Sequence, residues 1–217
     1  TWLERTVYRR AVRCIVLSEA FGRELVRRYG VAPERVRIVP GGVAAERFAL
    51  PHTRHEAREV LGWPTDRPIL LSVRRLVRRM GLERLIAAMA EVRRHVPDVL
   101  LLIAGRGPLA DALQAQIDAL GLAQHVRLLG FVPDDQLPLA YRAADLTVVP
   151  TVALEGFGLI TLEPLAAGTP VLVTPVGGLP EAVRELTEAL VLEEATSEAL
   201  AAGLIAAQLR RGVAARD

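Results

Sequence analysis

Glu155-Gly-Phe-Gly-Leu-Ile-Thr-Leu-Glu163 runs directly into Pro-Leu-Ala-Ala-Gly168-Thr-Pro170-Val-Leu-Val. The stretch predicts a glycine turn, a helix and then a strand, with a carboxylate on either side of the turn. Glycines before a helix let a ligand approach the backbone closely, and the free N–H groups there attract anions and hydroxyls. The two carboxylates can hold sugar hydroxyls, such as those of a ribose and a hexose.

Strand and helix patterns alternate along the rest of the chain. Continuous apolar runs predict strands at 14–17, 36–39, 69–73, 99–104, 126–129, 146–149, 171–174 and 189–192. Helical patterns fall at 19–29, 82–95, 109–120, 136–144, 159–167, 179–186 and 197–211. This alternation predicts an α/β fold with a doubly wound, Rossmann-like parallel sheet covered on both faces.

Composition shifts divide the chain into three parts. Residues 1–43 form a short βαβ unit that ends at Pro40-Gly41-Gly42. Residues 44–67 are polar and bounded by prolines, and they are interpreted as a linker. Residues 68–217 then carry the larger α/β domain.

Composition and charge exclude several classes of protein. The 27 basic residues are all arginine, are scattered, and are nearly balanced by 25 acids, which argues against nucleic acid as a partner. The four histidines show no spacing typical of metal ligands, so no metal site is expected. No apolar run approaches the ~18–20 residues that span a bilayer. With a single cysteine, Cys14, these features favour a cytoplasmic location, and peripheral contact with a membrane is left open.

The stretch around Glu155 and Glu163 resembles the Glu-x7-Glu signature of retaining glycosyltransferases of the GT-B fold, in glycosyltransferase family 4. Further stretches resemble loops of the same family that follow strand ends. They are Ser72–Leu82, Leu102-Ile-Ala-Gly105-Arg-Gly107-Pro108, Val126–Val132 and Thr174–Glu181. Ile15-Val-Leu-Ser18 and Val39-Pro-Gly-Gly42 resemble the end of the family's N-terminal domain. The chain thus resembles the C-terminal, donor-binding half of a GT-B enzyme with a remnant of the N-terminal, acceptor domain.

The resemblance implies roles for particular residues. Arg75 would pair with the donor diphosphate and Glu155 would steady the transferred sugar, so these two are the catalytic candidates. Glu163 would accept hydrogen bonds from the ribose hydroxyls. The remaining donor-binding candidates are Gly156, Phe157, Gly158, Arg74, Met80, Arg106, Phe131 and Val132. Family members usually need no metal or other cofactor, because cationic side chains neutralise the diphosphate.

Three positions depart from the family pattern. Met80 stands where the family has a lysine that grips the diphosphate, and Arg78, Arg79 or Arg106 would have to replace that cation. Arg74 stands where the family has a glycine, and Gly41 where it has an asparagine.

The expected activity is retaining transfer of a hexosyl unit from a nucleoside-diphosphate sugar to an acceptor hydroxyl. The acceptor is a sugar, a lipid or a small molecule, and the missing acceptor half comes from the rest of the protein or from a partner chain. Two alternatives stay open. The chain could be a non-catalytic or regulatory sugar-nucleotide-binding subunit, or it could belong to a GT-B sugar-nucleotide epimerase.

Overall fold

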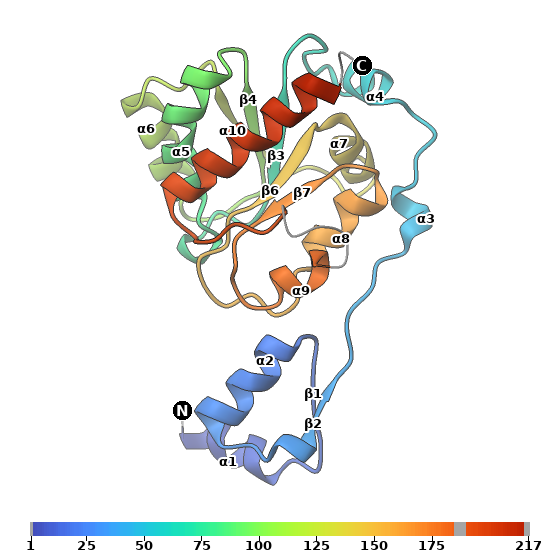
Figure 1. Cartoon of the computed structure of the whole chain (residues 1–217), viewed down its shortest axis with the longest axis vertical. Coiled ribbons are helices and arrows are strands. Elements are labelled where there is room, and N and C mark those ends of the chain that lie inside the picture. The colour runs from blue at the N-terminus through green and yellow to red at the C-terminus, as the bar shows by residue number, and fades with distance from the viewer. Residues whose placement is uncertain (1, 185–189, 215–217) are drawn as a thin grey trace.

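Five parallel strands form the central sheet of the molecule (Figure 1). The computed structural model describes residues 2–184 and 190–214, and it orders the strands β5-β4-β3-β6-β7. Their bounds are β3 (Ile69–Val73), β4 (Leu100–Ala104), β5 (Val126–Gly130), β6 (Leu146–Val149) and β7 (Val171–Val173). The chain leaves β3 toward β4 and leaves β6 toward β7, so it departs in opposite directions from two neighbouring strands. The crevice at such a switch point is where open α/β sheets bind ligands.

Helices cover both faces of this sheet. One face packs against α5 (Leu82–His95), α6 (Ala110–Ala119) and α10 (Ser197–Ala214). The other face packs against α7 (Leu137–Ala143) and α8 (Leu159–Ala166). The short helix α9 (Leu179–Val183) packs against side chains of β6 and β7. The doubly wound α/β fold expected from the sequence is therefore confirmed.

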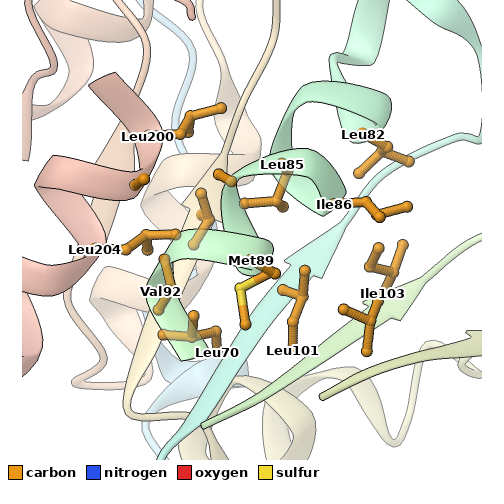
Figure 2. Close-up of a cluster of buried hydrophobic side chains, with 14 of the residues drawn as sticks. Leu70, Leu82, Leu85, Ile86, Met89, Val92, Leu101, Ile103, Leu200 and Leu204 are labelled. Carbon is orange, nitrogen blue, oxygen red and sulfur yellow. The ribbon is translucent and has the colours of Figure 1, made fainter. Parts of the chain in front are cut away.

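The core divides into two layers because neighbouring strand residues point to opposite faces. Leu70 and Leu101 meet Met89 of α5 and Leu204 of α10, and Figure 2 shows this interdigitation. Leu71, one residue further along β3, packs on the other face with the α7 side chains. All of these side chains are buried, which explains why the strands are continuous apolar runs.

Most element limits agree with the sequence pattern. Strands β3 and β6 and helix α5 begin and end at the predicted residues. The strand expected at 189–192 is reduced to one bridge between Val191 and Val173, and residue 189 lies outside the described part of the chain. Helix α9 ends at Val183, and residues 185 and 186 of its predicted range are likewise outside the described part.

The N-terminal residues form a small separate unit (Figure 1). Strands β1 (Cys14–Val16) and β2 (Val36–Ile38) pair in parallel. The helical segments of the unit are α1 (Trp2–Arg10), α2 (Glu19–Glu24), a π-helical turn η1 (Leu25–Tyr29) and a 3-10 turn η2 (Pro33–Arg35). Helix α1 was not predicted from the sequence. The long helix expected at 19–29 is present, with its last turn widened to the π form.

The segment 44–67 lies against the larger domain. It contains α3 (Ala45–Phe48) and α4 (Arg54–Leu61), which begins at a capping box between Thr53 and Glu56 and ends at Gly62. Phe48 is buried beside Tyr141, and α4 packs on α7. The three-part division of the chain stays a prediction, but this segment is folded onto the domain that follows it. No helix in the described part of the chain has the length and apolar character needed to cross a membrane.

Candidate functional site

Polar side chains meet where β3 and β6 end, at the switch point of the sheet. Arg74 follows β3, and Thr151 and Glu155 follow β6. The Nη2 atom of Arg74 donates hydrogen bonds to Thr151 Oγ1 and Glu155 Oε2, with the two ion-pair side chains only 7% and 15% exposed. The sequence reading treated Arg74 and Glu155 as separate candidates, and the structure joins them in one nearly buried ion pair.

Backbone packing around Arg74 fixes this geometry. The Arg74 N–H donates to the Ala104 carbonyl at 2.9 Å, which ties the loop after β3 to the loop after β4. Gly105 has φ +144°, and a Cβ there would overlap the Arg74 carbonyl oxygen. Only glycine fits at such a position. Gly105 therefore lets the loop after β4 lie directly against the backbone of Arg74.

The Gly-Phe-Gly turn forms the next wall of the site. Gly158 caps α8 in the left-handed conformation at φ 84°, and the buried Phe157 side chain anchors the turn. Within the described residues, the N–H groups of Gly156, Phe157 and Gly158 have no hydrogen-bond acceptor. Free N–H groups at a helix start are ready to bind an anion or a hydroxyl.

Glu163 lies on the first turns of α8 and is held by Tyr141. The Tyr141 hydroxyl donates to Glu163 Oε2 at 2.7 Å. Burial, and after it the neighbouring Glu163 carboxylate, raises the pKa of Tyr141 far above its usual value, and the positive charge of Arg74 opposes this shift. Arg74 therefore interacts electrostatically with the Tyr141 hydroxyl as well as with Glu155. This interaction links the Arg74–Glu155 pair to the Tyr141–Glu163 pair.

The arginines that could bind a diphosphate differ in the exposure and in the existing contacts of their side chains. Arg75 and Arg78 are exposed and have no partner among the described residues. Arg79 Nη1 donates to the Leu154 carbonyl at 3.0 Å. Arg106 stacks over Phe131, 5.1 Å from the ring centroid, and Phe131 is 56% exposed. Of the three replacements considered for the lysine, Arg79 has a hydrogen bond and Arg106 a ring contact, whereas the Arg78 side chain contacts no such partner within the described residues.

Two of the expected donor-binding residues pack against the core, Met80 completely and Val132 in part. Met80 is buried in the core with Leu82 and Leu85, because its turn directs the side chain under α5. Burial of this apolar side chain stabilises the folded state. It also leaves the site without a cation at this position. Val132 is partly buried against the core on the other face of the sheet.

The small N-terminal unit contacts the same rim through α2. Glu181 of α9 accepts hydrogen bonds from the backbone N–H groups of Glu19 and Ala20 at 2.7 and 2.8 Å. Ser18 Oγ donates to the Gly156 carbonyl at 2.5 Å. The carboxylate of Glu181 caps a helix of the other unit, a favourable place for a negative charge. The site loops are therefore docked onto the N-terminal unit.

A cavity of ≈ 300 Å³ lies between the two units beside Glu155. Its apolar walls come from Tyr8, Phe21 and Tyr29 on one side and from Leu154 on the other. Leu154 is exposed and has a positive φ of 57°, unusual for a residue other than glycine. The cavity opens next to a polar group, as ligand pockets do.

Sequence reasoning missed three residues of this arrangement. Tyr141 reads as a helix-face aromatic, Thr151 as a loop residue, and Glu181 only as the end of a glycine-rich motif. Their partners are distant in sequence, so no local spacing reveals the contacts. The one available signal was a tyrosine on a small-residue helix, because buried tyrosine hydroxyls usually need a partner.

The fold, with its ligand crevice at the switch point, is that of a GT-B glycosyltransferase domain. Residues 53–211 match the family "Glycosyl transferases group 1", and residues 1–47 match "Glycosyltransferase Family 4". The first match spans most of the chain. The chain belongs to this glycosyltransferase family, which confirms the resemblance found in the sequence.

Curated relatives point the same way. The chain is 37% identical, over 185 residues, to the GDP-mannose-dependent alpha-(1-6)-phosphatidylinositol monomannoside mannosyltransferase of Mycolicibacterium smegmatis, covering 81% of this chain and 48% of that protein. It is 38% identical over 188 residues to a D-inositol 3-phosphate glycosyltransferase of the same organism, covering 84% and 42%. The chain thus spans less than half the length of these two relatives.

Solved structures share the fold over nearly the whole chain. WaaG, a glycosyltransferase involved in lipopolysaccharide biosynthesis, matches with a TM-score of 0.82 and 26% identity, covering 97% of this chain and 58% of that one. Anabaena HepE, in complex with UDP and glucose, matches with a TM-score of 0.84 and 23% identity, covering 97% and 57%. At that identity the HepE likeness shows the fold alone.

Proposed function

We propose that this chain is the donor-binding part of an enzyme that moves a hexosyl unit from a nucleoside-diphosphate sugar to an acceptor hydroxyl, with retention. The observation that carries the proposal is the cluster at the switch point. There Glu155, paired with Arg74, and Glu163, held by Tyr141, flank the free N–H groups of the Gly-Phe-Gly turn. Sugar hydroxyls need acceptors and phosphates need N–H donors, and this rim offers both.

The roles follow from where the groups lie. Glu163 accepts hydrogen bonds from the ribose, and Glu155 accepts them from the transferred sugar. The exposed Arg75 guanidinium pairs with the diphosphate. The Arg106–Phe131 stack lies on the same rim and offers a flat face to the base.

In the reaction, the bond from the sugar C1 to the diphosphate oxygen breaks, and a bond from C1 to the acceptor oxygen forms on the same face. The acceptor proton goes to the departing diphosphate, so no protein base is required. Arg75 stabilises the negative charge that grows on the leaving group. The proposal includes no metal ion, since arginine side chains neutralise the diphosphate, and a chelator should leave transfer unchanged.

The acceptor enters through the cavity between the two units. This cavity adjoins Glu155, so its occupant lies beside the transferred sugar. The relatives' names give two different acceptors, a phosphatidylinositol mannoside and an inositol phosphate, so the acceptor class is not transferred to this chain. The remainder of the acceptor site belongs to the missing part of the N-terminal domain, supplied by the rest of the protein or by a partner chain.

Nucleotide binding tests the donor site without the acceptor domain. We expect calorimetry to detect micromolar to millimolar binding of one of GDP, UDP and ADP. Arg75→Ala should weaken that binding by about tenfold to a hundredfold, because a charged hydrogen bond contributes about 1.5–3 kcal/mol. Glu163→Ala should weaken it by about tenfold.

Arg127→Ala is the matched control, since Arg127 is an exposed arginine on β5, outside the cluster. It should leave nucleotide affinity unchanged. If a folded chain bound none of the three nucleotides, the proposed donor site would be overturned, and so would the alternative of a non-catalytic subunit that binds a sugar nucleotide.

A further inference from the structure

Tyr141 is a completely buried tyrosine, and among the described residues its hydroxyl has one partner, the carboxylate of Glu163. The two residues come from different helices, α7 and α8, which pack together on one face of the sheet. A buried hydroxyl needs a partner, but a carboxylate is a costly choice, because bringing its charge toward the interior carries a desolvation penalty. A neutral acceptor would satisfy the phenol more cheaply.

The surroundings hold the phenol in one place. The Tyr141 ring packs against Phe48, with centroids 6.1 Å apart, and the Tyr141 carbonyl accepts a hydrogen bond from Thr169 Oγ1 at 2.7 Å. Thr169 follows α8, so this second bond ties the two helices together at the other end of α8. The phenol is therefore a fixed donor, and its raised pKa keeps it protonated through the physiological range.

The bond engages only one oxygen of Glu163. Oε2 accepts from Tyr141, whereas Oε1 has no partner among the described residues. The side chain is partly exposed, on the helix whose N-terminal N–H groups line the candidate site. Oε2 is thus held by the Tyr141 hydroxyl, while Oε1 remains available to a ligand.

We propose that Tyr141 is a positioning residue: its hydroxyl holds Oε2 of Glu163 so that Oε1 is presented to the ribose hydroxyls of the donor. The inference rests on the proposed donor site and adds the residue that sets ribose selectivity. A carboxylate whose rotamer is already fixed loses less side-chain entropy when it binds, which raises its contribution to affinity.

Tyr141→Phe tests the inference, with ribose selectivity as the readout. Calorimetry would compare the preferred nucleoside diphosphate with its 2′-deoxy and 3′-deoxy forms. The unchanged chain should prefer the ribonucleotide by about tenfold. Tyr141→Phe should lose most of that preference, through weaker binding of the ribonucleotide and nearly unchanged binding of the deoxy forms.

Thr169→Val is the matched control. It removes the hydrogen bond to the backbone carbonyl of Tyr141, and so loosens the same helix pair without touching Glu163. It should lower stability and leave ribose selectivity intact. In a Glu163→Ala background, Tyr141→Phe should change selectivity no further, because the group that it positions is gone.

A second variant keeps the test decisive if Tyr141→Phe does not fold. Glu163→Gln preserves shape and still offers the phenol an oxygen, but it turns an NH2 group toward the ligand. It should remove ribose selectivity and retain stability. Unchanged selectivity in folded Tyr141→Phe would overturn the positioning role alone. Unchanged selectivity in Glu163→Gln would overturn both the positioning role and the assignment of Glu163 to the ribose. Absence of nucleotide binding in the unchanged chain would overturn both the positioning role and the proposed function.

Discussion

Arg58→Met is expected to lower the free energy of unfolding by about 3 kcal/mol, because it removes the closer and more deeply buried of the two arginines that pair with Asp145. Arg58 lies on α4 and is 5% exposed. Its Nη2 donates to Asp145 Oδ2 at 2.7 Å, its Nε to the Ala143 carbonyl at 2.9 Å, and its Nη1 to the Arg67 carbonyl at 3.1 Å. One guanidinium therefore joins α4 to the end of α7 and to the start of β3.

Asp145, the partner of Arg58, also binds the backbone of β3. Asp145 immediately precedes β6, and its Oδ2 also accepts the backbone N–H of Ile69, the first residue of β3, at 2.6 Å. Arg54 Nε also lies 3.5 Å from Asp145 Oδ1, but the Arg54 side chain is 35% exposed. Removing Arg58 would leave the charge of Asp145 to this more distant and more exposed arginine, at the start of the two central strands. Methionine keeps much of the arginine volume, so the measured loss reports the charge and its hydrogen bonds more than a cavity.

Urea unfolding followed by circular dichroism would measure the effect. Arg94→Met is the matched control, because Arg94 makes an ion pair of the same 2.7 Å length with Glu91 on the exposed face of α5. Exposed pairs contribute roughly 0–1 kcal/mol, so this variant should unfold almost as the unchanged chain does. A loss below about 1 kcal/mol for Arg58→Met would show that α4 is not anchored to the domain in this way.

The sheet could be predicted because its strands carry their own signal. β3 and β6 are continuous apolar runs with both faces covered, and their limits were predicted correctly. Helix α5 was also placed correctly, since Gly81 precedes it and Pro97 follows it closely. Once the strand order is known, the switch point between β3 and β6 follows, and so does the neighbourhood of Arg74 and Glu155.

Contacts between side chains of distant segments could not be predicted in the same way. The sequence places Glu155 and Glu163 at the rim, but nothing local indicates that Arg74 binds the first and Tyr141 the second. The polar composition of 44–67 likewise gives no sign that Arg58 is buried through its ion pair with Asp145. Met80 shows the converse, because a residue that was predicted to line the donor site lies in the core.

Arg74→Met is expected to lower the free energy of unfolding by about 3 kcal/mol, because Glu155 would keep its charge in a nearly enclosed position with the neutral Thr151 hydroxyl, and no cation, as its partner among the described residues. Glu155→Gln should cost less, about 1–2 kcal/mol, since the amide oxygen can still accept from Arg74. The double variant should cost clearly less than the sum of the two, with a coupling of about 2 kcal/mol.

Nucleotide binding separates two roles for Arg74. Its Nη2 is used by Glu155 and Thr151, and its Nε is buried without a partner. A guanidinium committed to these groups orients the carboxylate and does not grip a diphosphate. Arg74→Met should therefore leave nucleoside diphosphate affinity within about threefold, or less than 1 kcal/mol. It should remove the extra affinity that the intact sugar nucleotide gains over the free diphosphate.

The opposite pattern would assign Arg74 to the diphosphate. A loss of tenfold or more in affinity for the free nucleoside diphosphate, with additive stability effects in the cycle, would mean that Arg74 replaces the cation absent at Met80. Arg27→Met is the control for the stability arm, since Arg27 and Glu24 form an ion pair of 2.7 Å at the surface. That exposed pair should contribute less than about 1 kcal/mol, so a coupling near 2 kcal/mol at Arg74 would reflect the burial of the pair at the switch point.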